Sequence, residues 1–135
     1  MLEREGEGWR LAWDGQRDPF PVLIGGATWA SELTTAEGQA MAHALGVLQS
    51  QHRALVDTLM EEESISLEFQ SSTAEGGALW MALEGDRRNW SLHFVLQPAP
   101  GQRGLEGGWG CGAAVAFAQA CQDLLTPSGG TLPTH

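Results

Sequence analysis

The chain has 135 residues, 42% of them hydrophobic, which is enough for one core that needs no disulfide or metal to hold it. Seven arginines and no lysine stand against seventeen acidic residues, so the formal charge is −10. This charge disfavours nucleic acid and anionic lipid as partners, without excluding nucleic acid, and it favours a basic protein. The charged start has no apolar run behind it, which predicts a cytoplasmic protein with no membrane span. Cys111 and Cys121 lack metal or redox spacing and are expected to be reduced thiols.

Five segments alternate apolar and polar residues as half-buried strands do. The first spans Trp9 to Trp13. The second, residues 22–33, is either one kinked strand or two short ones, because Gly25-Gly26 suggests a bulge or a sharp bend. The other three are marked by alternate apolar residues: Ile65, Leu67 and Phe69; Leu79, Met81 and Leu83; Trp90, Leu92, Phe94 and Leu96. Short polar turns between them predict antiparallel hairpins.

A long helix is predicted at residues 35–61, behind a capping box formed by Thr34 and Glu37. Its apolar stripe repeats at alternating spacings of four and three, through Met41, Leu45, Leu48, His52, Leu55 and Leu59. Such a helix is about 40 Å long, so its stripe would outrun the sheet of its own chain unless the helix bends at Gly46. We therefore expect a homodimer that buries this stripe.

After the last strand, residues 98–112 are predicted to form a Pro- and Gly-rich loop that holds Trp109, and residues 113–125 a second, shorter helix. Residues 126–135 are expected to be a disordered tail, because they offer almost nothing to bury. The fold class is thus one α+β domain over residues 1–125. Its curved antiparallel sheet has about five strands, with two strands before the long helix and three strands and the short helix after it.

Possible catalytic and ligand-binding patterns are all incomplete. The segment Gly108–Ala113 matches a GxGxxA dinucleotide fingerprint but lacks the βαβ context, so a loop pinned by its tryptophan is favoured. Cys111 precedes the second helix, yet the sequence places no cation nearby to activate it. Ser91 and His93 point the same way, but no acid or oxyanion hole accompanies them. No catalytic, metal or cofactor residue is therefore predicted.

Two features suggest an interaction surface. Trp80 alternates with the inward Leu79 and Met81, so it faces the opposite side of the sheet together with His93. A second subunit, the C-terminal helix or a ligand should cover that side. The run Glu61, Glu62 and Glu63 is either a solvated helix end or a docking site for a basic partner or a divalent ion.

Several motifs resemble an uncharacterised protein family of cyanobacteria and their photosynthetic relatives. They are Gly8–Leu11, Ile24–Gly26, Trp29–Thr34, Leu59–Glu63, Trp80–Met81 and Trp90–Leu92. The resemblance covers about residues 7–125, and its motifs are structural. It implies the fold of single-stranded-DNA-binding transcriptional regulators of the positive-cofactor-four and Whirly type, in which curved antiparallel sheets and helices assemble into dimers or larger rings.

The preferred hypothesis is a non-enzymatic, dimeric protein-interaction or regulatory module with a basic protein partner. The alternative is binding of single-stranded nucleic acid to the sheet face. An enzyme of unknown class, which would have to unite Ser91, His93 and a carboxylate, is the third hypothesis.

Overall fold

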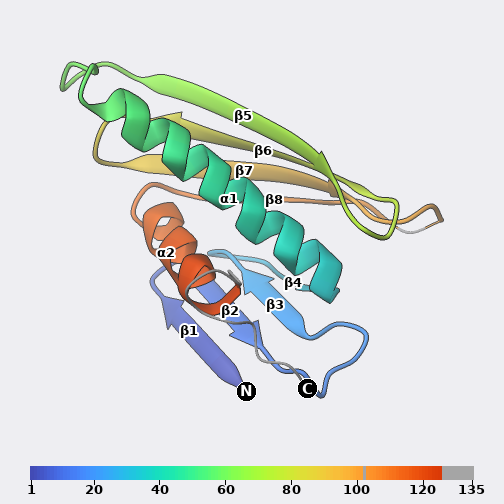
Figure 1. Ribbon diagram of the computed structural model, residues 1–135. Coiled ribbons are helices and arrows are strands. Elements are labelled where there is room, and N and C mark those ends of the chain that lie inside the picture. Colours follow the sequence, from blue (N-terminus) through green and yellow to red (C-terminus); the bar gives the residue numbers. More distant parts are fainter. Residues whose placement is uncertain (102, 126–135) are drawn as a thin grey trace.

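The computed structural model describes residues 1–101 and 103–125, and within them one arrangement occurs twice: a four-stranded antiparallel meander followed by a helix (Figure 1). The first unit contains β1 (Leu2–Gly6), β2 (Trp9–Trp13), β3 (Val22–Gly25), β4 (Ala30–Leu33) and α1 (Thr35–Val56). The second contains β5 (Ile65–Ser72), β6 (Ala78–Gly85), β7 (Trp90–Gln97), β8 (Leu105–Trp109) and α2 (Ala113–Leu125). The α+β class and the antiparallel pairing are confirmed, whereas the single five-stranded sheet is wrong. The expected tail, residues 126–135, lies outside the described residues.

The first sheet has the order β1-β2-β3-β4. Residues 22–33 form two strands, and Gly25-Gly26 starts the turn between them, where the Gly26 amide donates to the Trp29 carbonyl at 2.9 Å. Strand β1 is absent from the sequence prediction because all five of its residues are exposed, so it shows no alternation of apolar and polar positions.

The second sheet has the order β5-β6-β7-β8. The last strand, Leu105–Trp109, replaces part of the predicted loop. Its glycines conceal it from pattern analysis, yet at Gly107 packing requires glycine: a Cβ there would lie 2.9 Å from the Trp29 ring and 3.0 Å from the Phe94 ring. The glycines that make this segment resemble a loop in the sequence therefore suit a strand, because neighbouring aromatic rings fill the space that larger side chains would need.

Helix α1 begins as predicted, because the Thr34 hydroxyl accepts from the Glu37 amide and the Glu37 carboxylate accepts from the Thr34 amide. It continues through Gly46 and ends at Val56, five residues earlier than predicted. The stripe prediction is corrected accordingly. Leu55 is 38% exposed and Leu59, beyond the helix end, is half-buried, whereas the other four members are buried in the core of their own chain: Met41, Leu45, Leu48 and His52.

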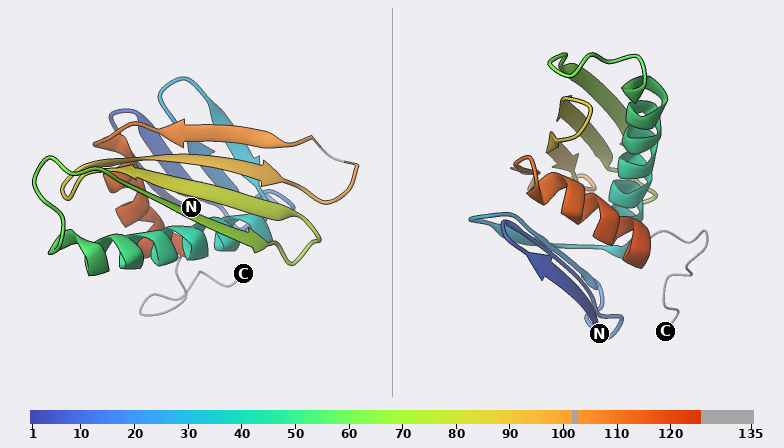
Figure 2. Two further views of the ribbon diagram at one scale, coloured as in Figure 1. Left: turned by 90° about the horizontal axis from the view of Figure 1, so that it is seen from above. Right: turned by 90° about the vertical axis from the view of Figure 1, so that its left-hand side faces the viewer.

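Both helices lie on the inner faces of the two sheets, and the two sheets diverge from each other (Figure 2). Helix α1 packs mainly on β5 and β6, and α2 packs on β1, β2, β7 and α1. Trp109 links the layers: its indole Nε1 donates to the Gly25 carbonyl at 2.8 Å, and its ring stacks on Phe117 with centroids 3.9 Å apart. Consequently the outer face of each sheet carries no helix from the described part of the chain, and α2 does not cover Trp80.

Candidate functional site

The outer face of β5–β8 is the candidate site, and the strand register determines which side chains meet on it. Residues at alternate positions of each strand point away from the helices. One cross-strand row runs from Glu68 through Ala82 to His93. The next row places Trp80 beside Val95. Four neighbouring strands therefore present polar and aromatic groups on one surface.

Four of these residues form a connected acidic band, defined as Glu68, Trp80, His93 and Glu106. The Trp80 indole Nε1 donates to Glu68 Oε1 at 2.7 Å. The His93 and Trp80 rings pack almost perpendicular to each other, with centroids 5.4 Å apart, and His93 Nε2 lies 3.0 Å from Glu106 Oε1. The band thus contains one member from each strand, with a carboxylate at each end and two rings between them.

The carboxylates of the acidic band have no arginine partner among the described residues. The arginine ion pairs lie elsewhere, joining Arg10 to Glu3, Arg17 to Glu32 and Arg88 to Glu61. Glu84 adds a third exposed carboxylate to the same outer face. Since His93 is the one basic side chain in this part of the face, the surface is acidic at neutral pH.

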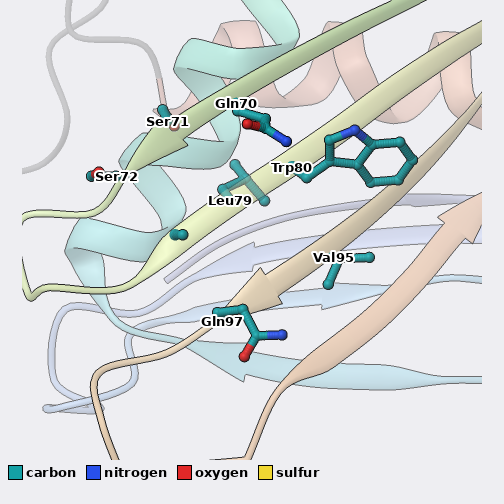
Figure 3. Close-up of a pocket in the computed structure, with 8 residues that line it drawn as sticks. Gln70, Ser71, Ser72, Leu79, Trp80, Val95 and Gln97 are labelled. Carbon is teal, nitrogen blue, oxygen red and sulfur yellow. The ribbon is translucent and has the colours of Figure 1, made fainter.

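A hollow of about 450 Å³ lies beside the acidic band, at the end of the sheet near the β5–β6 turn (Figure 3). Its lining carries no charged residue: Gln70, Ser71, Ser72, Ala78, Leu79, Trp80, Val95 and Gln97. The ring of Trp80 belongs to both features. The acidic band can therefore hold a cation while the hollow accepts the uncharged part of the same ligand.

The glutamate run lies elsewhere than predicted. Because α1 ends at Val56, Glu61, Glu62 and Glu63 occupy the connection to β5 and not the helix end. All three are exposed, Glu61 pairs with Arg88 at 3.3 Å, and Glu63 Oε1 accepts from the Met60 amide at 3.2 Å. One of the three glutamates thus has an arginine partner, whereas among the described residues neither carboxylate of the acidic band has one.

The structure does not assemble the catalytic combinations considered from the sequence. The Ser91 hydroxyl donates to the Glu84 carbonyl at 3.3 Å, while His93 contacts Glu106 and Trp80. Within residues 1–101 and 103–125, no group of three or more His, Cys, Asp and Glu side chains could hold a metal ion. In the same residues, no helix combines the length and apolar composition required to cross a membrane.

The two cysteines lie in different environments. Cys111 is exposed in the turn before α2, next to a second hollow lined by Glu7, Trp9 and Ala116 among others. Cys121 is completely buried on α2, and burial raises the pKa of its thiol far above the ordinary value because the thiolate would lose its hydration. Cys121 is therefore a core residue.

Comparisons with known proteins identify relatives but no activity. The model of a domain of unknown function, DUF1818, matches residues 4–124. A solved protein of unknown function from Prochlorococcus sp. NATL2A, assigned to the DUF155 family, is 32% identical. The match covers 90% of this chain and 97% of that one, with a TM-score of 0.79. No curated protein matches. The resemblance to an uncharacterised cyanobacterial family is thereby confirmed, whereas the fold of single-stranded-DNA-binding regulators stays a prediction.

Alternation along the strands predicts that Trp80 and His93 face outward, but both carboxylates of the acidic band are absent from the predicted interaction surface. Strand periodicity could have identified Glu68 as outward-facing, since it occupies a polar position between the apolar Leu67 and Phe69. Glu106 could not be assigned to a sheet face, because its strand was predicted to be part of a loop. Pairing partners across strands come from the register, and no local pattern in the sequence encodes the register between β7 and β8.

Proposed function

We propose that this chain, which belongs to the DUF1818 family of domains of unknown function, is a non-enzymatic module that binds an arginine-bearing segment of another protein. The segment docks on the outer face of β5–β8. The observation that carries the proposal is the acidic band on the outer sheet face, where two carboxylates flank the rings of Trp80 and His93. Within residues 1–101 and 103–125, these carboxylates have no arginine partner and no helix covers the face.

The chemistry of the acidic band matches a guanidinium group. An arginine side chain can stack on an indole face while its N–H groups donate to a nearby carboxylate in a bidentate arrangement. Glu68 already holds the Trp80 ring in place through the indole N–H, so the ring is oriented before a ligand arrives. This pre-organisation lowers the conformational entropy lost on binding.

Charge also favours a protein ligand over the alternative, single-stranded nucleic acid. Aromatic rings on a sheet face can stack with bases, and the half-buried Trp80 lies on such a face. Proteins that bind nucleic acid in this way line the surrounding groove with cations, because each phosphate must be neutralised. Here the ring shares its sheet face with three carboxylates: Glu68, Glu84 and Glu106. This surface would therefore repel a phosphate backbone and attract a basic peptide.

Isothermal titration with an alternating Arg-Ser decapeptide at low ionic strength tests the proposal. We expect Glu68→Gln and Glu106→Gln each to weaken binding roughly 3- to 10-fold, because each removes one carboxylate from the face. The matched control is Glu5→Gln, which removes the same charge from the outer face of the first sheet and should change affinity by less than about twofold.

The competing outcomes are distinct. An equal loss in all three variants would show attraction to net charge alone and would overturn the assignment of the site. Tighter binding of a thymine oligonucleotide than of the peptide, relieved by Trp80→Ala, would favour nucleic acid instead. A peptide in which lysine replaces every arginine should bind more weakly, because an ammonium group cannot combine stacking with bidentate donation.

A further inference from the structure

Strand β5 is an open edge of the second sheet. It has eight residues, and within the described part of the chain its one neighbour is β6. Half of its backbone N–H and C=O groups therefore point away from the sheet. Proteins usually protect such edges with short strands, lysine, proline or a bulge. Residues 65–72 contain no lysine or proline, and their register with β6 runs without a break from Ile65 to Ser72.

The inner side of β5 is also incompletely buried. On β6 and β7 the inner residues are buried, whereas Ile65, Leu67 and Phe69 are only half-buried. Leu67 and Phe69 pack against the core from one side. An added strand beyond β5 would cover the exposed part of this apolar row and would satisfy the open backbone groups at the same time.

The other edge strands lack this combination. Strand β1 is exposed throughout and carries Glu3, Arg4 and Glu5, so antiparallel pairing with a copy of itself about Arg4 would place like charges opposite each other. Strand β4 has four residues, and β8 has five, of which Gly107 and Gly108 have no side chain to pack. Among these edges, β5 is both the longest and the most apolar.

The surface of α1 next to this edge is uncharged. In a chain of charge −10, the helix carries one carboxylate, the buried Glu37, and one cation, Arg53. Helical spacing places a stripe of small and uncharged residues on one flank: Ala36, Ala40, His43, Val47 and Ala54. This α1 flank adjoins β5, because the rings of His43 and Phe69 lie 5.5 Å apart. Two acidic copies repel each other, so they can approach most closely through an uncharged surface.

We propose that a second copy of the chain pairs on this edge, β5 against β5, with Leu67 on the twofold axis. Antiparallel pairing in this register sets Leu67 opposite its own copy and Ile65 opposite Phe69 of the second copy, so the apolar row is matched throughout. On the outer side Ser66 faces Glu68 of the second copy, and no two like charges lie directly opposite. The α1 flanks of the two copies then lie side by side beneath the joined strands.

The dimer has a consequence for the outer face. Eight strands form one continuous sheet, so the acidic bands of the two copies lie on a single surface, with the two Glu68 side chains diagonal to each other across the axis. The proposal of the dimer rests on the edge and the α1 flank, and it does not depend on which ligand binds the acidic band. If both hold, one basic partner can engage two bands.

Substitutions at Ser66 test the register. They are made in a Glu84→Gln background, because Glu84 opposes Ser66 within the chain and would obscure the effect. Ser66→Glu places two glutamates opposite each other at two symmetric positions of the dimer and should raise its dissociation constant about tenfold. Ser66→Lys creates two attractive pairs at the same positions and should lower the constant by a comparable factor.

The matched control is Ser91→Glu in the same background, on the same outer face and also opposite residue 84, but on β7. Ser91 lies two strands from the β5 edge, so this substitution adds the same charge to the same face and should change dimerisation by less than about twofold. Sedimentation equilibrium between about 1 µM and about 1 mM measures all four proteins. Circular dichroism verifies that each is folded.

Two results would overturn the proposal. A monomer at the highest concentration would show that the edge stays open. A dimer or larger assembly that responds equally to Ser66→Glu and Ser91→Glu, or to neither, would place the contact on another surface. Opposite shifts for the two Ser66 variants, with Ser91→Glu unchanged, are the expected result and are independent of any peptide titration.

Discussion

The two sheets share a topology but differ in their outer faces. On the first sheet, the acidic Glu3 and Glu32 are paired with Arg10 and Arg17. On the second, the carboxylates of the acidic band contact an indole and an imidazole instead. The strands differ as well: those of the first sheet have four or five residues, whereas β5, β6 and β7 have eight each. The two sheets share one topology, yet their outer faces suit different roles.

This difference shows that the repeated topology does not by itself determine function. Both sheets provide an inner face for the shared core, and the inner residues obey the same alternation. What distinguishes them is the set of side chains that the core does not require. The first sheet neutralises its outer charges locally, which is typical of a scaffold surface. The second leaves charge and aromatic surface uncompensated, which is typical of a binding surface.

The largest expected effect comes from breaking the junction between the sheets. Trp109 is buried, donates to the first sheet at Gly25 and stacks on Phe117 of α2. Trp109→Ala should lower the free energy of unfolding by about 3–5 kcal/mol, because it leaves a large cavity and a carbonyl without its donor. Urea unfolding followed by circular dichroism measures the loss.

The comparison variant is Trp80→Ala, on the outer face of the second sheet. It should cost well under half as much stability as Trp109→Ala, since Trp80 is only half-buried and leaves no enclosed cavity. Equal losses would mean that the outer face contributes to the core as much as the junction does. A Trp109→Ala protein that unfolds in two separate steps would show that this residue couples two otherwise independent units.

A smaller effect distinguishes the contacts of α1 with each unit. At Gly38 a Cβ would lie 2.9 Å from Val22 Cγ2 in the first sheet, whereas at Gly46 it would meet only Gln122 Nε2, at 3.6 Å. Gly38→Ala should therefore destabilise the protein by about 1 kcal/mol, since overpacking exceeds the gain in helix propensity. Gly46→Ala should stabilise it by about 0.5–1 kcal/mol.

Thermal and urea unfolding of the two alanine variants decide this prediction through their opposite signs. Stabilisation in both would mean that β3 moves easily away from α1, and destabilisation in both would mean that α2 approaches Gly46 more closely than the distances indicate. Each variant is the control for the other, because both replace glycine by alanine inside the same helix.

Most of the fold could be predicted from the sequence, and the errors have physical reasons. Strands with one buried face can be recognised by the alternation of apolar and polar residues, as in β2, β5, β6 and β7. The capping box correctly located the start of α1. Strand β1 has no buried face and β8 has glycines in place of side chains, so neither carries an apolar pattern. The repeat went undetected because the two units share topology and not residues.

The candidate site could be predicted only in part, because it depends on pairing. Periodicity predicts the direction in which a side chain points, and it placed Trp80 and His93 correctly. It does not predict which residues of distant strands lie side by side, so the partners Glu68 and Glu106 emerged only with the register. The prediction that a second copy covers the apolar stripe of α1 needed correction for a related reason. The spacing of apolar residues on a helix does not reveal whether their own chain or another one covers them.

The smallest effect concerns a turn of the second sheet and its dependence on pH. The Asp86 carboxylate accepts from the backbone amides of Asn89 at 2.8 Å and Arg88 at 2.9 Å, closing the β6–β7 turn. These hydrogen bonds, that of Asn89 foremost, hold the pKa of Asp86 below its ordinary value. A lowered folded-state pKa means that the ionised group stabilises the turn above the unfolded pKa, and that this stabilisation is lost as the pH falls through the folded pKa.

Asp86→Asn should therefore reduce stability at neutral pH and have a progressively smaller effect as the solution is acidified below about pH 4. Urea unfolding of wild type and variant at a series of pH values measures this difference. Glu62→Gln, which removes one exposed charge from the connection between α1 and β5, allows the effect of net charge to be subtracted. A difference between wild type and Asp86→Asn that does not change with pH would show that the Asp86 charge contributes nothing. The turn would then depend on side-chain shape alone, as a neutral asparagine can provide.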